Sequence, residues 1–322
     1  MNTTKLVWSI EIIDLKLKYD WKISRNTSRF KQNLVVKING VPVGEAAPNI
    51  RWGETVDQLT LEFKKIESKL PGSIEEICKF RTELRSFNIC QSLKCALDMA
   101  ILSFTEKKQL FGGCQTSYSI PILNIGEYED FFNNQNLFRF DSIKVKLDSN
   151  LVMERLSEIR SFYSGRLFVD FNEAFSSLDQ FKLIIDELNK AQIEVVEQPF
   201  CSKNLEHNRS VKKILEGSLF LDENIIDERI TVDLLDFCDG VNIKIQKTGG
   251  PTRAQEMLDQ ASKIGLKKMV GCMVETSLGI SQSMRLSGVD YYDLDGSLMI
   301  ENEPFGLLKE EDGTLVIVDS KI

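Results

Sequence analysis

Six charged residues stand at or near the ends of five strand-like segments in the middle of the sequence. They are Lys144, Lys146, Asp170, Glu197, Asp222 and Lys244. From Lys144 onward, the segments follow one another at intervals of 22 to 27 residues, enough for one strand, one helix and two short loops. Strands that alternate with helices in this way indicate βαβ units and a parallel sheet. Because parallel strands end at the same edge, the pattern predicts a cluster of three carboxylates and three lysines.

The three carboxylates suit a hard metal ion. Asp170, Glu197 and Asp222 come from three consecutive segments, and a ligand set made only of oxygen atoms favours Mg²⁺. Each residue alone would be an ordinary helix cap or ion-pair partner, but three at equivalent positions repel one another unless a cation is present. The only histidine, His207, lies in a polar segment, which argues against zinc-hydrolase and histidine-nucleophile mechanisms.

The lysines suit acid–base chemistry. Lys144 and Lys146 are two residues apart on one segment, so both side chains point to the same face of the sheet. Two neighbouring ammonium groups lower each other's pKa, and a lysine with a lowered pKa can act as a base. Lys244 comes from a segment four further on, across the expected sheet. A substrate held between Lys146 and Lys244 would therefore meet one lysine on each side.

The first third of the chain reads as a separate α+β domain at residues 1–113. Strands are expected at 5–19 and on either side of the Asn39-Gly40 turn signal, and helices at 53–70, 73–87 and 92–110. Strands followed by helices, rather than alternating with them, favour a domain of its own.

Residues 114–301 show the repeated strand and helix pattern of a (β/α) barrel. Eight strands are expected at 116–122, 142–147, 166–172, 193–200, 219–225, 240–247, 266–273 and 291–296. In such barrels the chemistry lies at the C-terminal ends of the strands, where the charged residues fall. The tail at 302–322 contains a further strand, Thr314–Ser320, which we expect to return to the first domain.

The combination of motifs resembles the enolase superfamily, in its muconate-lactonizing-enzyme-like subgroup. The matching motifs are K-V-K at 144–146, D-F-N at 170–172, E-Q-P at 197–199, D-E-N at 222–224 and N-I-K-I-Q-K-T-G-G at 242–250. G-E-A-A-P at 44–48 and G-E-T at 53–55 are similar to the superfamily's capping-domain segments. The resemblance covers essentially the whole chain. It implies a modified TIM-type barrel of (β/α)7β form with an N-terminal α+β capping domain.

Two C-terminal motifs resemble those of the dipeptide epimerases, such as the L-Ala-D/L-Glu epimerases. G-C-M-V-E-T-S lies at 271–277 and D-L-D-G at 293–296. The resemblance implies that Asp293 and Asp295 bind the ammonium group of a dipeptide, and that Ser119 contacts the substrate. Two carboxylates two residues apart on a strand do face the same way. Where the superfamily often has D-A-N-Q-G-W, this chain has D-F-N-E-A-F, which keeps Asn172 as a substrate-site residue and bears on specificity.

The resemblance implies a Mg²⁺-dependent reaction that inverts the α-carbon of the dipeptide's second residue. Asp170, Glu197 and Asp222 would hold the metal ion, and Lys144 would add a second positive charge at the substrate's carboxylate. Lys146 and Lys244 would exchange the α-proton on opposite faces, through an enediolate.

The expected specificity loop at residues 18–31 is basic. It carries Lys18, Lys22, Arg25, Arg29 and Lys31, so it either binds an acidic side chain of the substrate, as in Ala-Glu, or is a solvated surface loop.

Three other functions remain open. An o-succinylbenzoate synthase and a racemase of N-acylated amino acids would share the metal and lysines, but their substrates have no ammonium group for Asp293 and Asp295. A catalytically silent binding protein on the same scaffold would not need all three carboxylates and all three lysines.

The composition restricts the partners and the cellular compartment that we expect for the protein. The net charge of −8 argues against a nucleic-acid partner. Neither a signal peptide nor a membrane helix is expected. Seven scattered cysteines without a C-x-x-C motif suit free thiols in a reducing cytoplasm. We therefore expect a cytoplasmic enzyme with a small-molecule substrate, and the composition is compatible with a homo-oligomer.

Overall fold

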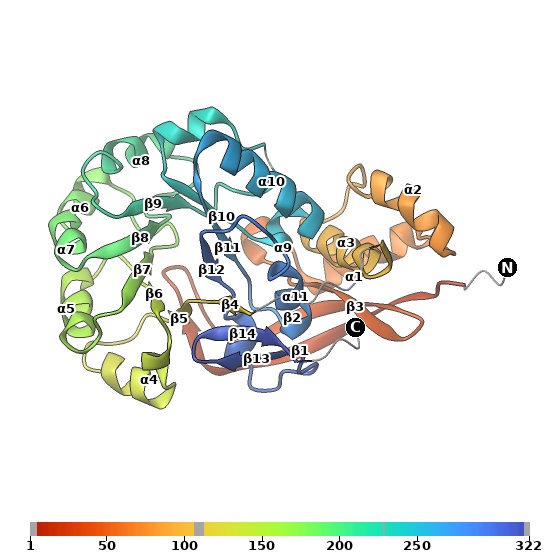
Figure 1. The fold of residues 1–322 in the computed structure, drawn as a ribbon, viewed down its shortest axis with the longest axis horizontal. Coiled ribbons are helices and arrows are strands. Elements are labelled where there is room, and N and C mark those ends of the chain that lie inside the picture. Colours follow the sequence, from red (N-terminus) through yellow and green to blue (C-terminus); the bar gives the residue numbers. More distant parts are fainter. Residues whose placement is uncertain (1–4, 106–112, 228, 319–322) are drawn as a thin grey trace.

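The computed structural model describes residues 5–105, 113–227 and 229–318. Its main elements are an eight-stranded barrel sheet and a three-stranded antiparallel sheet with its own helices (Figure 1). The α/β class and the barrel with an added N-terminal sheet, expected from the sequence, are confirmed. The division at residue 113 stays a prediction, and part of the predicted helix at 92–110 lies outside the described residues.

The N-terminal sheet consists of three sequential strands. They are β1 (Trp8–Lys22), β2 (Thr27–Ile38) and β3 (Val41–Ala46), paired antiparallel in that order. Asn39 and Gly40 connect β2 to β3 with φ angles of 53° and 82°, as a tight hairpin turn requires. Most of the expected loop at 18–31 belongs to the β1–β2 hairpin, because only residues 23–26 separate the two strands.

Three helices cover this sheet. They are α1 (Val56–Ile66), α2 (Ile74–Leu84) and α3 (Gln91–Thr105), with short 3-10 turns η1 (Ile50–Trp52) and η2 (Glu67–Lys69). Leu34 and Val36 of β2 pack with Leu59, Phe80 and Leu97 of the helices in one buried cluster. The N-terminal sheet therefore has a hydrophobic core of its own.

The barrel sheet contains all eight strands expected from the sequence. They are β5 (Tyr118–Ile120), β6 (Ser142–Lys146), β7 (Arg166–Asp170), β8 (Ile193–Glu197), β9 (Ser218–Leu221), β10 (Gly240–Ile243), β11 (Lys267–Gly271) and β12 (Tyr291–Asp293). All neighbours pair in parallel. The amide of Ser117 donates to the carbonyl of Tyr292 at 2.9 Å, which links the first strand segment to the last.

Helices surround the barrel strands (Figure 1). They are α4 (Tyr128–Asn134), α5 (Val152–Phe162), α6 (Leu178–Lys182), α7 (Ile185–Lys190), α8 (Leu205–Val211), α9 (Ile245–Thr248), α10 (Pro251–Ile264) and α11 (Ser277–Ser283), with 3-10 turns η3 (Leu137–Arg139), η4 (Val232–Asp236) and η5 (Gly296–Met299). Their apolar faces cover the outward side chains of the strands in two large buried clusters.

Inside the barrel, an apolar layer lies beneath a charged one. Phe168, Val195 and Phe220 form a buried cluster with Met269. Side chains on a strand alternate between faces, so the residues two positions later, Asp170, Glu197 and Asp222, also point inward and lie one layer nearer the strand ends. The strands thus place the charged residues above a closed apolar floor.

The C-terminal tail forms a small third sheet. β13 (Leu308–Glu311) and β14 (Thr314–Ile317) form a hairpin, and β14 also pairs with β4 (Cys114–Gln115). The tail strand pairs with the segment that leads into the barrel, and Asn302, at the start of the tail, donates to the carbonyl oxygen of Asp14 on β1. The assignment of the tail to the N-terminal domain stays a prediction. Residues 319–320 of that expected strand lie outside the described residues.

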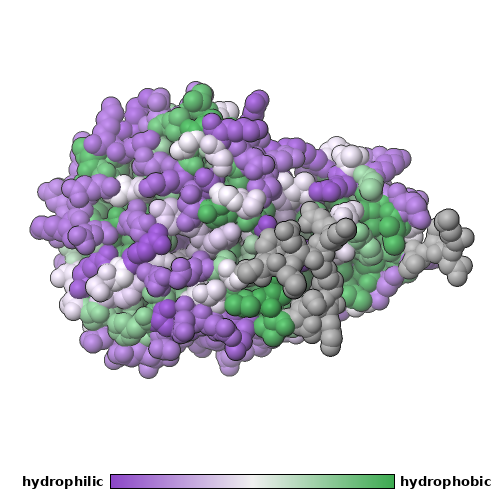
Figure 2. All heavy atoms as spheres, viewed as in Figure 1, coloured by the Kyte–Doolittle hydropathy of each residue, from purple (hydrophilic) through white to green (hydrophobic). Residues whose placement is uncertain are grey.

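Hydrophilic side chains cover most of the face in Figure 2. In the part of the chain that the structure describes, we find no helix both long enough and apolar enough to cross a lipid bilayer.

The G-E-A-A-P segment joins the N-terminal sheet to the barrel. The buried carboxylate of Glu45, on β3, accepts hydrogen bonds from the amides of Thr276 and Gly279, both at 3.0 Å, and from the side chain of Asn33 at 2.7 Å. Gly44 lies so close to α3 that an added Cβ would be 2.0 Å from the carbonyl oxygen of Ala96. This glycine therefore sets how closely β3 can approach α3.

We expect Gly44→Ala to destabilise the protein by about 1–3 kcal/mol, because the new methyl group meets backbone atoms that cannot rotate away. Urea unfolding of both variants measures this. Gly72→Ala is the control, because its added Cβ would meet only the Glu76 side chain, at 3.6 Å. Equal stability of the two variants would contradict the close approach.

Candidate active site

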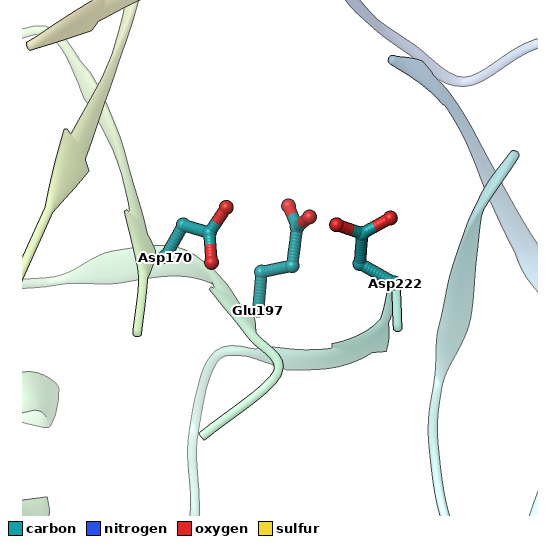
Figure 3. Close-up of side chains that lie close together, drawn as sticks. All are labelled: Asp170, Glu197 and Asp222. Atoms are coloured by element: carbon teal, nitrogen blue, oxygen red, sulfur yellow. The ribbon is translucent and has the colours of Figure 1, made fainter. Parts of the chain in front are cut away.

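Three buried carboxylates converge at the C-terminal ends of neighbouring barrel strands. Asp170 ends β7, Glu197 ends β8 and Asp222 follows β9. One oxygen atom of each lies within 4.8 Å of the others, and Figure 3 shows the three groups turned toward a common space. The parallel register pairs Lys146 with Asp170, and Asp170 with Glu197, so strand pairing itself brings these residues together. The sequence-based prediction that the three carboxylates meet is correct.

The residues present fit a metal ion. Three carboxylates with no histidine are the donor set of a hard divalent cation. Beside them, Asn172 Oδ1 and Glu223 Oε2 are buried acceptors that lack a hydrogen-bond donor among the described residues. Mg²⁺ usually keeps several bound water molecules, which would supply donors to such atoms. Burial, with the charges of Asp222 and Asp170, raises the pKa of Glu223 to about 7, and a nearby cation would favour its ionised form.

Lys144 lies beneath this site, completely buried. Its ammonium group is 2.8 Å from Glu197, 3.2 Å from Asp170 and 2.8 Å from Asp293. Burial disfavours the charged ammonium, but Asp293, Glu197 and Asp170 outweigh that effect and raise the pKa of Lys144 well above its usual range. The expectation that Lys146 would lower the pKa of Lys144 is therefore wrong, because nearby carboxylates dominate its surroundings.

Lys146 and Lys244 approach the carboxylates from opposite sides. Lys146, the last residue of β6, donates to Asp170, and Lys244, just after β10, lies 3.0 Å from Asp222. Burial disfavours the charge on Lys244, but Asp222 outweighs burial and raises its pKa. The strands β6 and β10 are separated by three others in the sheet, so the cavity between the two lysines is flanked on both sides.

Two buried residues of this cluster were missed in the sequence analysis. Lys247, in α9, forms an ion pair with Asp222 and donates to its carbonyl oxygen at 2.6 Å. The side chain of Asn242 donates to Glu197 at 2.9 Å. Both lie in the quoted N-I-K-I-Q-K-T-G-G motif, but the strand expected at 240–247 would have pointed Lys247 away from Lys244. The α9 turn brings Lys247 back toward Asp222.

Asp293, Asp295 and Ser119 meet at the other end of the cavity. Asp293 ends β12 and accepts hydrogen bonds from Ser117 at 2.7 Å and from Ser119 at 3.2 Å. Asp295 accepts from the backbone amide of Ser119. Burial, together with the charge of Asp293, raises the pKa of Asp295 to about 7. A cationic group bound here would stabilise both carboxylates in their ionised forms.

A cavity of about 300 Å³ joins the two ends. Its lining includes Lys146, Lys244, Asp222, Asn172, Ser119 and Asp295. The β1–β2 hairpin contributes Trp21 and Ile23, and the segment around η1 contributes Ile50 and Trp52. Seven of the site residues expected from the sequence thus line one cavity, under a cover from the N-terminal domain, and Lys144, Asp170 and Glu197 lie buried behind this lining.

The tip of the β1–β2 hairpin is fastened above the carboxylates. Arg25 lies 2.8 Å from Glu173 and 2.9 Å from Glu223, and it donates to the carbonyl oxygen of Asn172 at 3.0 Å. Glu173 also pairs with Arg51 of η1 at 2.9 Å. Glu173 is the residue that replaces glutamine in the D-A-N-Q-G-W pattern, so here it binds both covering segments.

The remaining cations of the basic segment differ in position. Lys18 and Lys22 are exposed, and Arg29 pairs with Asp20 at 3.7 Å. Lys31, on β2, is half-buried and lines the cavity. Of the five residues, Arg25 and Lys31 therefore reach the site, and Lys18, Lys22 and Arg29 do not line it.

Comparison with known proteins gives a consistent family. The family described as "Enolase C-terminal domain-like" matches residues 130–296. An L-Ala-D/L-amino acid epimerase of Pedosphaera parvula is 30% identical over 325 residues, covering 94% of this chain and 93% of that protein. Another, from Flavobacterium johnsoniae, is 28% identical over 310 residues, covering 90% of each. The chain therefore belongs to the enolase superfamily.

A solved structure supports the same fold. A dipeptide epimerase from Enterococcus faecalis, complexed with Mg and the dipeptide L-Leu-L-Tyr, has a TM-score of 0.86 with this chain at 22% identity, covering 98% of this chain and 97% of that one. Within the superfamily, the chain groups with isomerases.

We expect Mg²⁺ to stabilise the folded protein by about 2.7 kcal/mol at roughly 100 times its Kd, because only the folded chain assembles the three carboxylates. Glu197→Gln should abolish this response in a thermal unfolding titration, because it removes the charge of one metal ligand. Lys144 would keep its ion pairs with Asp170 and Asp293 in this variant.

The matched control is Glu194→Gln, on the same strand, where Glu194 pairs with Arg166 at 2.7 Å. This control should respond to Mg²⁺ as the wild type does. Stabilisation that persists in Glu197→Gln would contradict the assignment of the metal site.

Proposed function

We propose that this protein is a Mg²⁺-dependent dipeptide epimerase that inverts the α-carbon of the second residue. The observation that carries the proposal is the opposed pair Lys146 and Lys244 in the cavity lining, ion-paired to Asp170 and Asp222 respectively. Two such groups can remove a proton from one face of a carbon and return one to the other face. The epimerase names of the relatives support the same reaction.

Asp170, Glu197 and Asp222 would hold the metal ion, and the substrate's α-carboxylate would bind beside them. When bound, the ion would supply positive charge at that carboxylate, where charge develops as the enediolate forms. Lys144, already in contact with Asp170 and Glu197, would contribute a second positive charge from below.

Lys146 and Lys244 would then act as base and conjugate acid on opposite faces of the α-carbon. When the neutral amine of one lysine takes the proton, the ammonium of the other gives a proton to the opposite face. The direction of the reaction exchanges their roles. The wall of the cavity and the fastened hairpin tip would keep bulk water from the carbanionic carbon.

Asp293 and Asp295 favour a substrate with a free ammonium group. Lys144 already compensates Asp293, but an N-acylated amino acid or a succinylbenzoate precursor offers no positive charge to the buried carboxylate of Asp295 beside it. This pair is why the dipeptide reaction is preferred to the racemase and synthase alternatives.

The two lysines can be separated by isotope exchange. Lys244→Ala should lose α-deuterium incorporation from one epimer of the dipeptide by about 100-fold or more, and Lys146→Ala from the other, because acid–base catalysis contributes on this scale. Lys144→Ala should impair exchange from both epimers. Mass spectrometry of each epimer in deuterated water measures the effect.

Lys267→Ala serves as the control, because Lys267 is exposed on the outer end of β11. Equal losses of exchange from both epimers in both Lys146→Ala and Lys244→Ala would contradict the two-face assignment.

The ammonium subsite makes a separate prediction. Asp295→Asn should weaken free dipeptides by about 1.5–3 kcal/mol, the range for a hydrogen bond to a charged group. Analogues with an acylated amino group should lose much less. Inhibition constants for matched free and N-acetylated dipeptides measure the difference.

Asp290→Asn is a suitable control, since Asp290 precedes β12 and pairs with Lys268 at 3.0 Å. If an N-acylated amino acid or a succinylbenzoate precursor turns over far faster than every free dipeptide, the epimerase proposal fails.

A further inference from the structure

The cationic side chains around the cavity are not equally available to a ligand. Five line it: Arg25, Lys31, Arg51, Lys146 and Lys244. Lys146 and Lys244 pair with Asp170 and Asp222, and Arg25 and Arg51 pair with Glu173. Within the described ranges, Lys31 has neither an ion-pair nor a hydrogen-bond partner for its ammonium group. Lys31 is therefore the cation of the cavity lining that is available to pair with an anionic group of a ligand.

Lys31 lies near the middle of the β1–β2 hairpin and not at its tip. It pairs in register with Leu15 of β1, which packs with Met299 of η5. Asn33, two residues further along β2 and therefore on the same face, donates to the carbonyl oxygen of Val274 at 2.9 Å. These contacts put Lys31 over the ends of β11 and β12, the side of the cavity that carries Asp295.

The hairpin tip lies at the opposite end. Arg25 reaches Asn172 and Glu223, which follow the metal ligands Asp170 and Asp222 in sequence. The sequence favoured an acidic second residue of the substrate, recognised by the basic segment as a whole. Arg25, the cation nearest the metal ligands, is already neutralised by Glu173 and Glu223, so it offers little net charge to that residue's side chain.

The orientation of a dipeptide connects these positions to substrate choice. With its α-carboxylate at the metal ligands and its ammonium at Asp293 and Asp295, the first residue lies at the end of the cavity that Lys31 covers. Burial lowers the pKa of Lys31, because its charge has lost part of its hydration without gaining a partner. A carboxylate bound beside the Lys31 ammonium group would supply the missing partner for its charge.

We propose that Lys31 is a specificity-determining residue that binds a carboxylate on the side chain of the substrate's first residue, so that the preferred substrates are dipeptides of the Glu-Xaa or Asp-Xaa type. This inference rests on the proposed epimerase function. It differs from the expectation of an Ala-Glu substrate in placing the acidic group on the amino-terminal half.

The test compares α-deuterium incorporation into the second residue of five dipeptides: Glu-Ala, Gln-Ala, Ala-Ala, Ala-Glu and Ala-Gln. The wild type should prefer Glu-Ala to Gln-Ala by at least about tenfold in kcat/KM, mainly through KM, as expected for a charge-assisted contact away from the reacting carbon. Lys31→Met should reduce the ratio of Glu-Ala to Gln-Ala to about one, and Lys31→Arg should largely retain it.

Lys37→Met is the matched control, on the same strand but outside the cavity lining, where Lys37 pairs with Glu11. It should keep the wild-type ratio. If Lys31→Met does not fold, Lys31→Gln takes its place. The wild-type ratio of Glu-Ala to Gln-Ala in kcat/KM tests the preference without any variant.

Three results would overturn the inference: no preference for Glu-Ala in the wild type, a preference that survives loss of the Lys31 charge, or a Lys31-dependent preference for Ala-Glu over Ala-Gln instead. In each case exchange into a dipeptide still supports the epimerase function. If none of the five dipeptides exchanges while N-succinyl-alanine does, the epimerase function fails, and the inference about Lys31 fails with it.

Discussion

The completely buried ammonium group of Lys144 connects the two ends of the site. It contacts Glu197 and Asp170 on one side and Asp293 on the other, so one positive charge stabilises carboxylates from both ends. Several buried carboxylates without cations would carry a large desolvation penalty and would repel one another. Lys146, Lys244 and Lys247 complete the compensation around Asp170 and Asp222. The barrel can therefore hold a strongly charged interior above its apolar floor.

The cover of the site depends on a different set of contacts. Glu45 anchors β3 to the segment after β11, and Glu173 ties both covering segments to the loop after β7. The contacts of β3, and of Asn33 in the middle of β2, thus lie near the end of β11, and the hairpin tip is fixed near β7. Because both ends are fixed, side chains between them have set positions over the cavity. This arrangement would allow Lys31 and Arg25 to face different parts of a bound substrate.

Much of the site could be predicted because it depends on strand periodicity. Asp170, Glu197 and Asp222 end consecutive parallel strands, and the pairing register alone brings them together. The Asn39-Gly40 turn was equally readable, because two positive φ angles demand those residue types. Features that depend on tertiary packing could not be predicted from the sequence. The raised pKa of Lys144 comes from Asp293, 149 residues away, together with Glu197 and Asp170. The position of Lys247 depends on a helical turn that the strand-like sequence of 240–247 does not reveal. The pairing of β14 with β4 likewise follows from contacts between distant segments.

The central claim is that two lysines on opposite faces of the α-carbon carry the proton. Its most direct test is epimerisation of a protiated L,L-dipeptide in deuterated water, stopped early, with the two epimers separated and weighed by mass spectrometry. The two-base account predicts that the product epimer carries solvent deuterium at its α-carbon in nearly every molecule, because the donating lysine exchanges its protons with solvent before it acts. A product epimer that instead retains the substrate's own proton would show that a single base serves both faces, and would contradict the account.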